Sequence, residues 1–353
     1  MVKCNPNPID LKGLLDGPPA VISTKEGTSV PSVEARLLVD CRCHLGECVL
    51  WDDQENAVLF TSILDRKFHK LRLAEKGETV LRSYGLDKML CAFGLLEAPI
   101  TSTEETRGEK TASPGYVVAW EDGFQLYDLQ NNKPLGPMSI GETVNRNGLP
   151  DRLNDGRVDP SGRRFVCGGC AASPEAPLKV YKCEYDSFTK GLKHSVILDR
   201  ILTTNSICWS LSGEEMYIAD SPSKTIRKFE YDVDKGTMQN GEILHSKEFG
   251  FPDGSVVDSQ GYLWNATWRQ GEGIGMVDRI DPNSGDVVFT VHLPDETSEA
   301  SCCCFGGKNL DILFITTAHE NIDPESEPHA GGLYAVKLPS GMTGCQEKRF
   351  RNI

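Results

Sequence analysis

The 353-residue sequence has no long run of apolar residues and no stretch with a sustained 3.6-residue hydrophobic period. The first absence argues against a membrane-spanning helix, which needs about 20 consecutive apolar residues. The second predicts that helices are few and short. The N-terminus lacks a basic region followed by an apolar core, so no secretion signal is expected. Positive charge is also scarce, and the formal net charge of −14 disfavours nucleic acid and anionic membranes as partners.

Two further absences bear on chemistry. The Gly-x-Ser-x-Gly turn of serine hydrolases is missing, which argues against that mechanism. Without a secretion signal, the thirteen cysteines are expected to be reduced thiols in a cytoplasmic protein. Cys167 and Cys170 have the spacing of a zinc or redox pair, but no second Cys or His pair stands at a suitable distance, so a structural role is favoured. The run Cys302–Cys304 is predicted to fill a strand.

The sequence does contain a repeat of two short apolar strands joined by an Asp, Ser or Gly turn. Its clearest copies begin near Asn154, Asn205 and Asp253, at intervals of about 50 residues, which suits a propeller blade of four strands. Fainter copies begin near residues 51, 116 and 303. Six units predict an all-β, six-bladed β-propeller over residues 35–345, preceded by an N-terminal extension over 1–34. This extension, or the polar loop expected at 101–114, could cover the central pocket.

A propeller gathers the first strand of every blade around a central channel, so polar residues near the start of those strands converge there. The candidates are Glu47, Asn154, Asn205 and Asp253. Taken singly, Asn and Asp before such turns are more often structural. Their corresponding positions in different blades nevertheless favour a small site for a hard cation. Oxygen donors suit calcium, magnesium or manganese, and zinc also accepts them.

Four blocks of the sequence resemble the landmarks of the regucalcin (senescence marker protein) and gluconolactonase family. They are Cys41–Trp51, Arg152–Gly162, Pro252–Gly254 together with Gly261–Trp264, and Cys303–Asn309. The likeness runs in order and spacing from about residue 36 to residue 340. It implies a six-bladed propeller with one divalent metal ion in the channel, calcium or zinc in the first place and magnesium or manganese as alternatives. The implied activity is hydrolysis of sugar-acid lactones such as gluconolactone or arabinonolactone.

The resemblance also implies roles for individual residues. Glu47, Asn205 and Asp253 correspond to the metal ligands of the family, and Asp253 also corresponds to the catalytic base. Arg152 and Asn154 correspond to residues that contact substrate hydroxyls. These assignments suit the chemistry, because lactone hydrolysis needs a polarised carbonyl, an attacking water and stabilisation of an oxyanion.

The sequence departs from the family pattern in three places. Ser206 follows Asn205 where many members have glycine, which weakens the assignment of that ligand. The segment Cys167–Ala172 replaces a Gly-Thr-Met segment with a substrate-contacting acid nearby, so the choice among lactones stays open. One extra residue precedes Gly46 and Glu47, although the Gly-Glu pair itself is kept.

Three other functions are compatible with these residues. One is a non-catalytic, calcium-binding regulatory propeller, and another is an esterase or organophosphate hydrolase that uses the same metal. A third is a propeller that binds a protein on its face, although no protein partner can be specified. Arg152 and Asn154 favour catalysis, because a pure cation binder has no use for sugar-hydroxyl donors. Asp220 is kept as a candidate neighbour of the ligands, and His319 is expected to be a packed or exposed residue.

Overall fold

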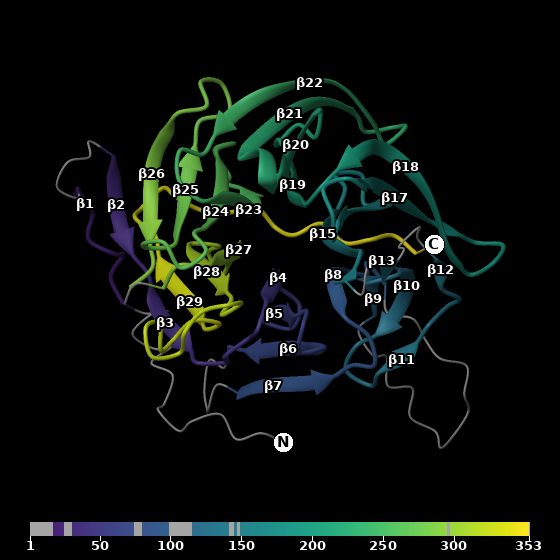
Figure 1. The fold of residues 1–353 in the computed structure, drawn as a ribbon, viewed down its shortest axis with the longest axis horizontal. Helices are drawn as coiled ribbons and strands as arrows, with labels where there is room; N and C mark the ends of the chain where they lie inside the picture. Colours follow the sequence, from purple (N-terminus) through teal and green to yellow (C-terminus); the bar gives the residue numbers. More distant parts are fainter. Residues whose placement is uncertain are drawn as a thin grey trace.

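Six mainly antiparallel sheets stand around one axis in the computed structural model (Figure 1). The structure describes residues 17–24, 30–73, 80–98, 115–140, 145–146, 149–294 and 297–352. This arrangement confirms the predicted all-β, six-bladed propeller. Within the described ranges the only helix is a three-residue 3-10 turn, η1 (Ser221–Ser223). No helix in this part of the chain is both long and apolar enough to cross a bilayer.

Each blade contains four strands that follow one another from the channel outward. The first blade consists of β4 (Gly46–Asp52), β5 (Ala57–Ser62), β6 (Lys67–Arg72) and β7 (Val80–Gly85). The second consists of β8 (Leu90–Leu95), β9 (Tyr116–Trp120), β10 (Gly123–Asp128) and β11 (Lys133–Pro134), with β12 (Ser139–Ile140) also paired to β10. The third consists of β15 (Arg152–Val158), β16 (Arg164–Cys170), β17 (Leu178–Asp186) and β18 (Gly191–Ile201). A separate hairpin, β13 (Asn145–Arg146) and β14 (Leu149–Pro150), precedes the third blade.

The second half of the ring repeats the same plan. The fourth blade consists of β19 (Thr204–Trp209), β20 (Glu215–Asp220), β21 (Thr225–Asp232) and β22 (Thr237–Ser246). The fifth consists of β23 (Phe251–Val257), β24 (Leu263–Trp268), β25 (Met276–Ile280) and β26 (Val287–His292), and it also carries β2 (Pro31–Glu34) and β1 (Ser23–Thr24) at its outer edge. The sixth consists of β27 (Ala300–Gly306), β28 (Ile312–Thr317), β29 (Leu333–Lys337) and β3 (Arg36–Val39).

The ring is closed by strands from opposite ends of the chain. β3 is the outermost strand of the sixth blade, where Leu37 pairs with Tyr334. β2, which precedes β3 in the chain, pairs in parallel with β26 of the fifth blade through Ser32 and Thr290. Because the first and last parts of the chain share a sheet, the blades cannot separate without breaking these ladders.

The inner strands are packed on both faces. All seven residues of β4 and all seven of β27 are buried, so these strands do not alternate between apolar and polar residues. The three consecutive cysteines of β27 lie in this packed centre, and burial raises the pKa of Cys303 to about 12. A thiol in such surroundings is inert and acts as a small apolar side chain.

Every inner strand carries an irregularity near its beginning, where its register with the second strand shifts. These shifts fall between Glu47 and Leu50, Leu90 and Ala92, Leu153 and Gly156, Asn205 and Cys208, Pro252 and Ser255, and Ala300 and Cys302. A β-bulge bends the strand and redirects side chains out of the alternating pattern. Six bulges at corresponding points therefore give one end of the channel a ring of side chains that regular strands would place elsewhere.

The C-terminal segment (344–352) crosses the ring after the last blade, as the yellow trace in Figure 1 shows. Phe350 is fully buried and forms a bridge with Leu96 of the second blade. Arg349 forms an ion pair of 2.6 Å with Asp52, at the end of β4 opposite Glu47. The segment therefore lies at the far end of the channel from the bulges.

Candidate metal and substrate site

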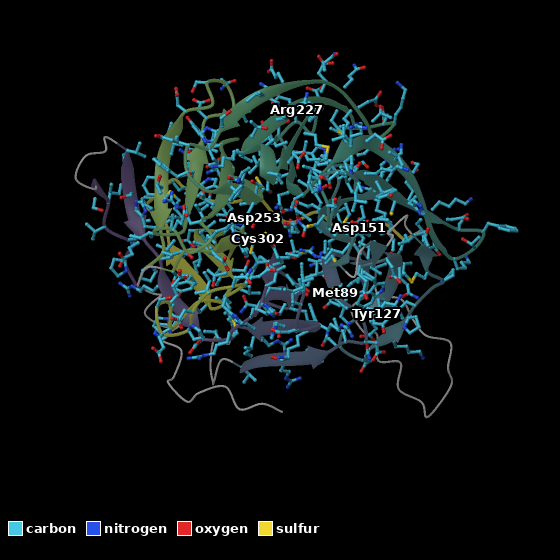
Figure 2. The ribbon with its side chains drawn as sticks, viewed as in Figure 1. Met89, Tyr127, Asp151, Arg227, Asp253 and Cys302 are labelled. Carbon is cyan, nitrogen blue, oxygen red and sulfur yellow. The ribbon has the colours of Figure 1, made fainter. Side chains whose placement is uncertain are left out.

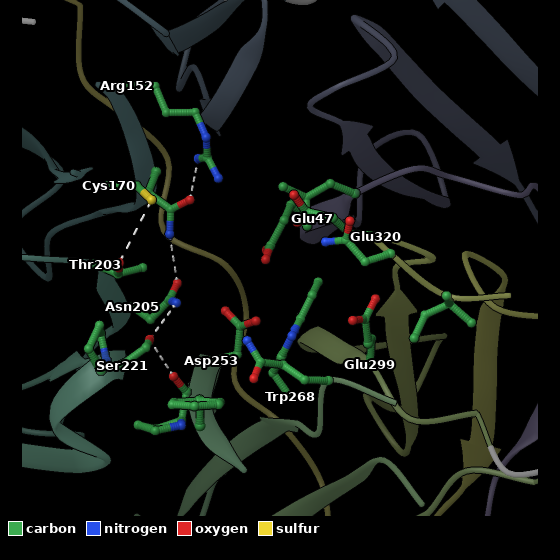
Figure 3. Close-up of a pocket in the computed structure, with 18 residues that line it drawn as sticks. Glu47, Arg152, Cys170, Thr203, Asn205, Ser221, Asp253, Trp268, Glu299 and Glu320 are labelled. Carbon is green, nitrogen blue, oxygen red and sulfur yellow. Dashed lines mark hydrogen bonds between the residues drawn. The ribbon is translucent and has the colours of Figure 1, made fainter. Parts of the chain in front are cut away.

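A cavity of about 490 Å³ opens at the end of the channel where the inner strands begin. All five residues proposed from the sequence line it (Figure 3): Glu47, Arg152, Asn154, Asn205 and Asp253. Figure 2 shows Asp253 near the middle of the ring and Arg227 toward its rim. The structure thus brings together, from four different blades, residues that are about 50 to 200 positions apart in sequence.

Bulges place two of the predicted ligands. Glu47 and Asn205 are each the last residue before a register shift. The residues that follow them have positive backbone φ angles, 48° for Cys48 and 62° for Ser206. Glycine adopts this conformation without steric cost, which accounts for the expected glycine after Asn205. Ser206 adopts it as well, and its hydroxyl lies 2.6 Å from that of Ser255, so the departure at this position keeps Asn205 in the cavity.

Hydrogen bonds connect the predicted substrate-binding residues to the predicted ligands. Arg152 donates through Nη1 to Oδ1 of Asn154. Asn154 in turn donates through Nδ2 to Oδ1 of Asn205 at 3.0 Å and to the carbonyl of Thr204 at 2.8 Å. Both N–H groups of the Asn154 amide are therefore engaged, which fixes the orientation of this side chain, and its oxygen can still accept one further hydrogen bond.

The same network continues into the fifth blade. Asn205 donates through Nδ2 to the hydroxyl of Ser221 at 2.8 Å, and Ser221 donates to the carbonyl of Pro252 at 2.7 Å. These bonds direct the carbonyl oxygen of the Asn205 amide, rather than its nitrogen, toward Asn154 and the cavity (Figure 3). Ser221 thus holds a predicted ligand in place and tethers it to the residue before Asp253.

The carboxyl groups at the site are buried close together and repel one another. Burial, followed by the charge of Asp155, raises the pKa of Glu47 to about 8. Burial, together with the charges of Glu47 and Asp155, also raises the pKa of Asp253 well above its usual value. Oδ1 of Asp253 is buried and has no hydrogen-bond partner within the described residues. A positive charge among these oxygens would relieve the repulsion and satisfy the free oxygen.

These observations fit a divalent cation. Glu47, Asn205 and Asp253 offer only oxygen donors, which hard cations prefer. No group of three His, Cys, Asp or Glu side chains is placed to hold a metal in the described part of the chain. The third donor of the predicted set is instead the amide oxygen of Asn205. The two cysteines singled out in the sequence separate, because Cys170 lines the cavity and Cys167 is fully buried in the core.

Two other residues considered in the sequence lie outside the cavity lining. Asp220 accepts hydrogen bonds from the backbone N–H groups of Leu202 at 3.2 Å and Thr203 at 2.9 Å, so it shapes a turn. His319 stacks on His44, with ring centroids 5.0 Å apart and ring planes at 3°. Two segments, the N-terminal extension 1–34 and the loop 101–114, were considered as covers for the pocket. The loop and residues 1–16 and 25–29 of the extension fall outside the described residues, whereas β1 and β2 of the extension lie at the outer edge of the fifth blade.

Several lining residues were missed by sequence reasoning. They include Ser221, Phe251, Trp268, Glu299 and Glu320. Glu299 could have been found, because it directly precedes an inner strand, and the other candidates are among the first three residues of theirs. Trp268 ends a second strand and Ser221 begins η1, and no feature of the repeat distinguishes such positions.

Comparison with known proteins gives a consistent result. Residues 45–319 match the family described as the SMP-30/Gluconolactonase/LRE-like region. Regucalcin from Homo sapiens is 30% identical over 311 residues, which cover 86% of this chain and 93% of that protein. The structure of a calcium-binding regucalcin from Agrobacterium tumefaciens superposes with a TM-score of 0.71 at 25% identity, covering 91% of this chain and 98% of the other. A gluconolactonase from Xanthomonas campestris shares the fold, with a TM-score of 0.59 at 18% identity over 92% of this chain and 97% of its own.

Proposed function

The chain belongs to the SMP-30/gluconolactonase/LRE-like family, and on this basis we propose that it is a divalent-metal-dependent lactonase. Its substrates are sugar-acid lactones such as gluconolactone or arabinonolactone, which it opens to the free hydroxy acids. The observation that carries the proposal is the convergence of Glu47, Asn205 and Asp253 with Arg152 and Asn154 on one cavity. Three of these residues suit a cation, and the other two suit a polyhydroxylated ring.

The metal is held by Glu47, Asn205 and Asp253 in this proposal. A bound divalent cation supplies Lewis acidity, which polarises the lactone carbonyl and stabilises negative charge as it develops. The all-oxygen donor set supports calcium, and the related regucalcin from Agrobacterium tumefaciens is named as a calcium-binding protein. Zinc is the first alternative, followed by magnesium and manganese.

Asp253 is the proposed base. If one oxygen of its carboxylate holds the cation, the other can accept a proton from the attacking water. The water oxygen forms a bond to the carbonyl carbon and the ring C–O bond then breaks. The proton passes to the departing ring oxygen, so that the product is an open hydroxy acid. Cation binding lowers the basicity of this carboxylate, and its burial acts in the opposite direction.

Arg152 and Asn154 orient the substrate in this proposal. Within the described residues, Arg152 uses its Nη1 for the carbonyl of Leu153 at 3.1 Å and for Asn154. Its other N–H groups can therefore donate to substrate hydroxyls. The twelve described cysteines are all free thiols, which supports a cytoplasmic location as part of the same proposal.

Replacement of Asp253 tests these assignments. We expect Asp253→Asn to lower kcat/KM for gluconolactone by at least about 10³-fold and to weaken metal affinity, because both the base and a charged ligand are lost. Asp234→Asn is the matched control, since the Asp234 side chain is 95% exposed and should retain full activity. Full activity of Asp253→Asn would contradict the mechanism. Tight metal binding by the unaltered protein without turnover of any lactone would favour a regulatory cation binder, and turnover of other esters or phosphotriesters alone would favour a related hydrolase.

A further inference from the structure

Glu299 lies near the beginning of the inner strand of the sixth blade, one residue before the position that Glu47 and Asn205 hold in their blades. It directly precedes the inner strand β27, next to the register shift between Ala300 and Cys302. Its side chain lines the cavity (Figure 3). In that view, Glu299 and Arg152 lie on opposite sides of the group of side chains, with Asp253 between them.

The backbone of Glu299 is held from two sides. Its carbonyl accepts a hydrogen bond of 3.1 Å from the N–H of Ala318, and the residue forms an isolated antiparallel bridge with Trp268. The preceding residue is also anchored, because the N–H of Ser298 donates to Oε2 of Glu327 at 2.9 Å. The direction of the Glu299 side chain is therefore set by backbone contacts within the sixth blade and with the fifth.

The carboxyl group itself is buried and incompletely satisfied. Glu299 is 1% exposed, and its Oε2 has no hydrogen-bond partner within the described residues. Burial, followed by the charges of Glu320 and Glu327, raises its pKa to about 8, and a hydrogen bond from the backbone of Glu320 acts in the opposite direction. Leaving a buried polar atom unpaired is costly. A ligand that enters the cavity would supply the missing partner.

The neighbouring side chains indicate what kind of partner this is. Trp268 gives the cavity an apolar surface beside Glu299, and the C–H face of a sugar ring can lie against such a surface. A hydroxyl group can donate to a carboxylate and accept from a carboxylic acid. It can thus satisfy Oε2 in either protonation state, whereas a simple hydrocarbon ring cannot.

We propose that Glu299 is a specificity-determining residue, whose free oxygen hydrogen-bonds a substrate hydroxyl across the cavity from Arg152 and Asn154. The inference rests on the proposed lactonase function and makes it more specific. Arg152 and Asn154 hold one side of the ring, and Glu299 selects lactones that carry a hydroxyl on the other side. A site built to bind a hydroxyl discriminates strongly against an analogue that lacks it, because its buried polar atom is then left unpaired.

The test compares two substrates that share the same ring. Glucono-δ-lactone carries hydroxyls, and δ-valerolactone carries none. Glu299→Met removes the carboxyl and keeps most of its volume, whereas Glu299→Gln keeps a hydrogen-bonding group. Glu325→Gln is the control, because Glu325 is exposed and absent from the cavity lining. If Glu299→Met fails to fold, Glu299→Ala replaces it in the same comparison.

We expect Glu299→Met to lower kcat/KM for glucono-δ-lactone by about 10- to 100-fold and to change it for δ-valerolactone by less than about threefold. Glu299→Gln should retain most of the preference, and Glu325→Gln should leave it unchanged. An equal loss on both lactones, or no loss on glucono-δ-lactone, would overturn the proposal.

Calorimetry separates this inference from the lactonase proposal. If the unaltered protein opens neither lactone, the lactonase proposal fails, and the role of Glu299 is then decided by titration of gluconate and 5-hydroxypentanoate in the presence of calcium. The inference is supported if Glu299→Met binds gluconate more weakly than the unaltered protein does and binds 5-hydroxypentanoate equally well. Equal affinity of gluconate for the unaltered protein and this variant overturns it.

Discussion

Removal of Glu347 should destabilise the whole ring, although this residue lies in the C-terminal segment. Glu347 forms a two-pronged ion pair with Arg157 of the inner strand β15, with N···O distances of 3.0 and 3.2 Å. The two side chains are only 12% and 13% exposed. Burial would lower the pKa of Arg157, but the charge and hydrogen bonds of Glu347 outweigh it, so the pKa is raised.

The size of the effect follows from what Glu347→Ala leaves behind. Removing one partner of a buried pair typically costs about 3–5 kcal/mol, because the other charge stays buried without compensation. Arg157 keeps a hydrogen bond to the carbonyl of Ser255, so the lower end of this range applies. We expect the free energy of unfolding to fall by about 3 kcal/mol.

Urea unfolding of the metal-free protein measures this loss. The exposed pair of Arg163 and Asp234, with side-chain exposures of 47% and 95%, provides the control, and Asp234→Ala should cost less than about 0.5 kcal/mol. The double variant Arg157→Met with Glu347→Leu should recover most of the loss, because no charge then remains buried. A cost below about 1 kcal/mol for Glu347→Ala would refute the view that the C-terminal segment holds the ring together.

Two other changes test the packing and the acid sensitivity of the ring. Phe350→Ala should lower the free energy of unfolding by about 3–5 kcal/mol, since Phe350 is fully buried in the core, and thermal unfolding of the variant should show a reduced Tm. Burial, then the charge of Lys67, lowers the pKa of His69 to about 4. In the unfolded chain His69 takes up its proton near pH 6.5, whereas in the folded protein it does so only near pH 4. As the pH falls from 6.5 to 4, the free energy of unfolding therefore decreases by up to about 3 kcal/mol. Urea unfolding between pH 4.5 and 7 should show that the free energy of unfolding depends less on pH in His69→Gln than in the unaltered protein. An unchanged pH dependence would contradict the assignment.

The number of blades could be predicted because each repeat is marked by a pattern of neighbouring residues. The Asp, Ser and Gly turns and the apolar strands beside them lie within a few residues of one another. Closure of the ring is different, because the pairing of Leu37 with Tyr334 joins segments almost a full chain length apart. No local pattern marks such a pairing. The contacts of Glu347 and Phe350 were missed for the same reason, since a short polar tail gives no periodic signal.

The candidate site was predictable to the extent that it follows the repeat. Asn154, Asn205 and Asp253 stand at corresponding points of three blades, and the structure places all of them in one cavity. The bulges that aim them were not predictable, because Cys48 and Ser206 take positive φ angles without being glycine. Sequence alone also gave no reason to expect Trp268 in the cavity, since a tryptophan at the end of a strand is usually core.

The most direct test of the lactonase account is hydrolysis of gluconolactone by metal-stripped protein, followed by proton release before and after addition of calcium, zinc, magnesium or manganese. The proposed ligands Glu47, Asn205 and Asp253 predict turnover at the spontaneous rate without metal and restored catalysis with calcium or zinc. Full activity of the metal-stripped protein would contradict the metal-dependent mechanism. Tight metal binding without turnover of gluconolactone or arabinonolactone would contradict the lactonase assignment.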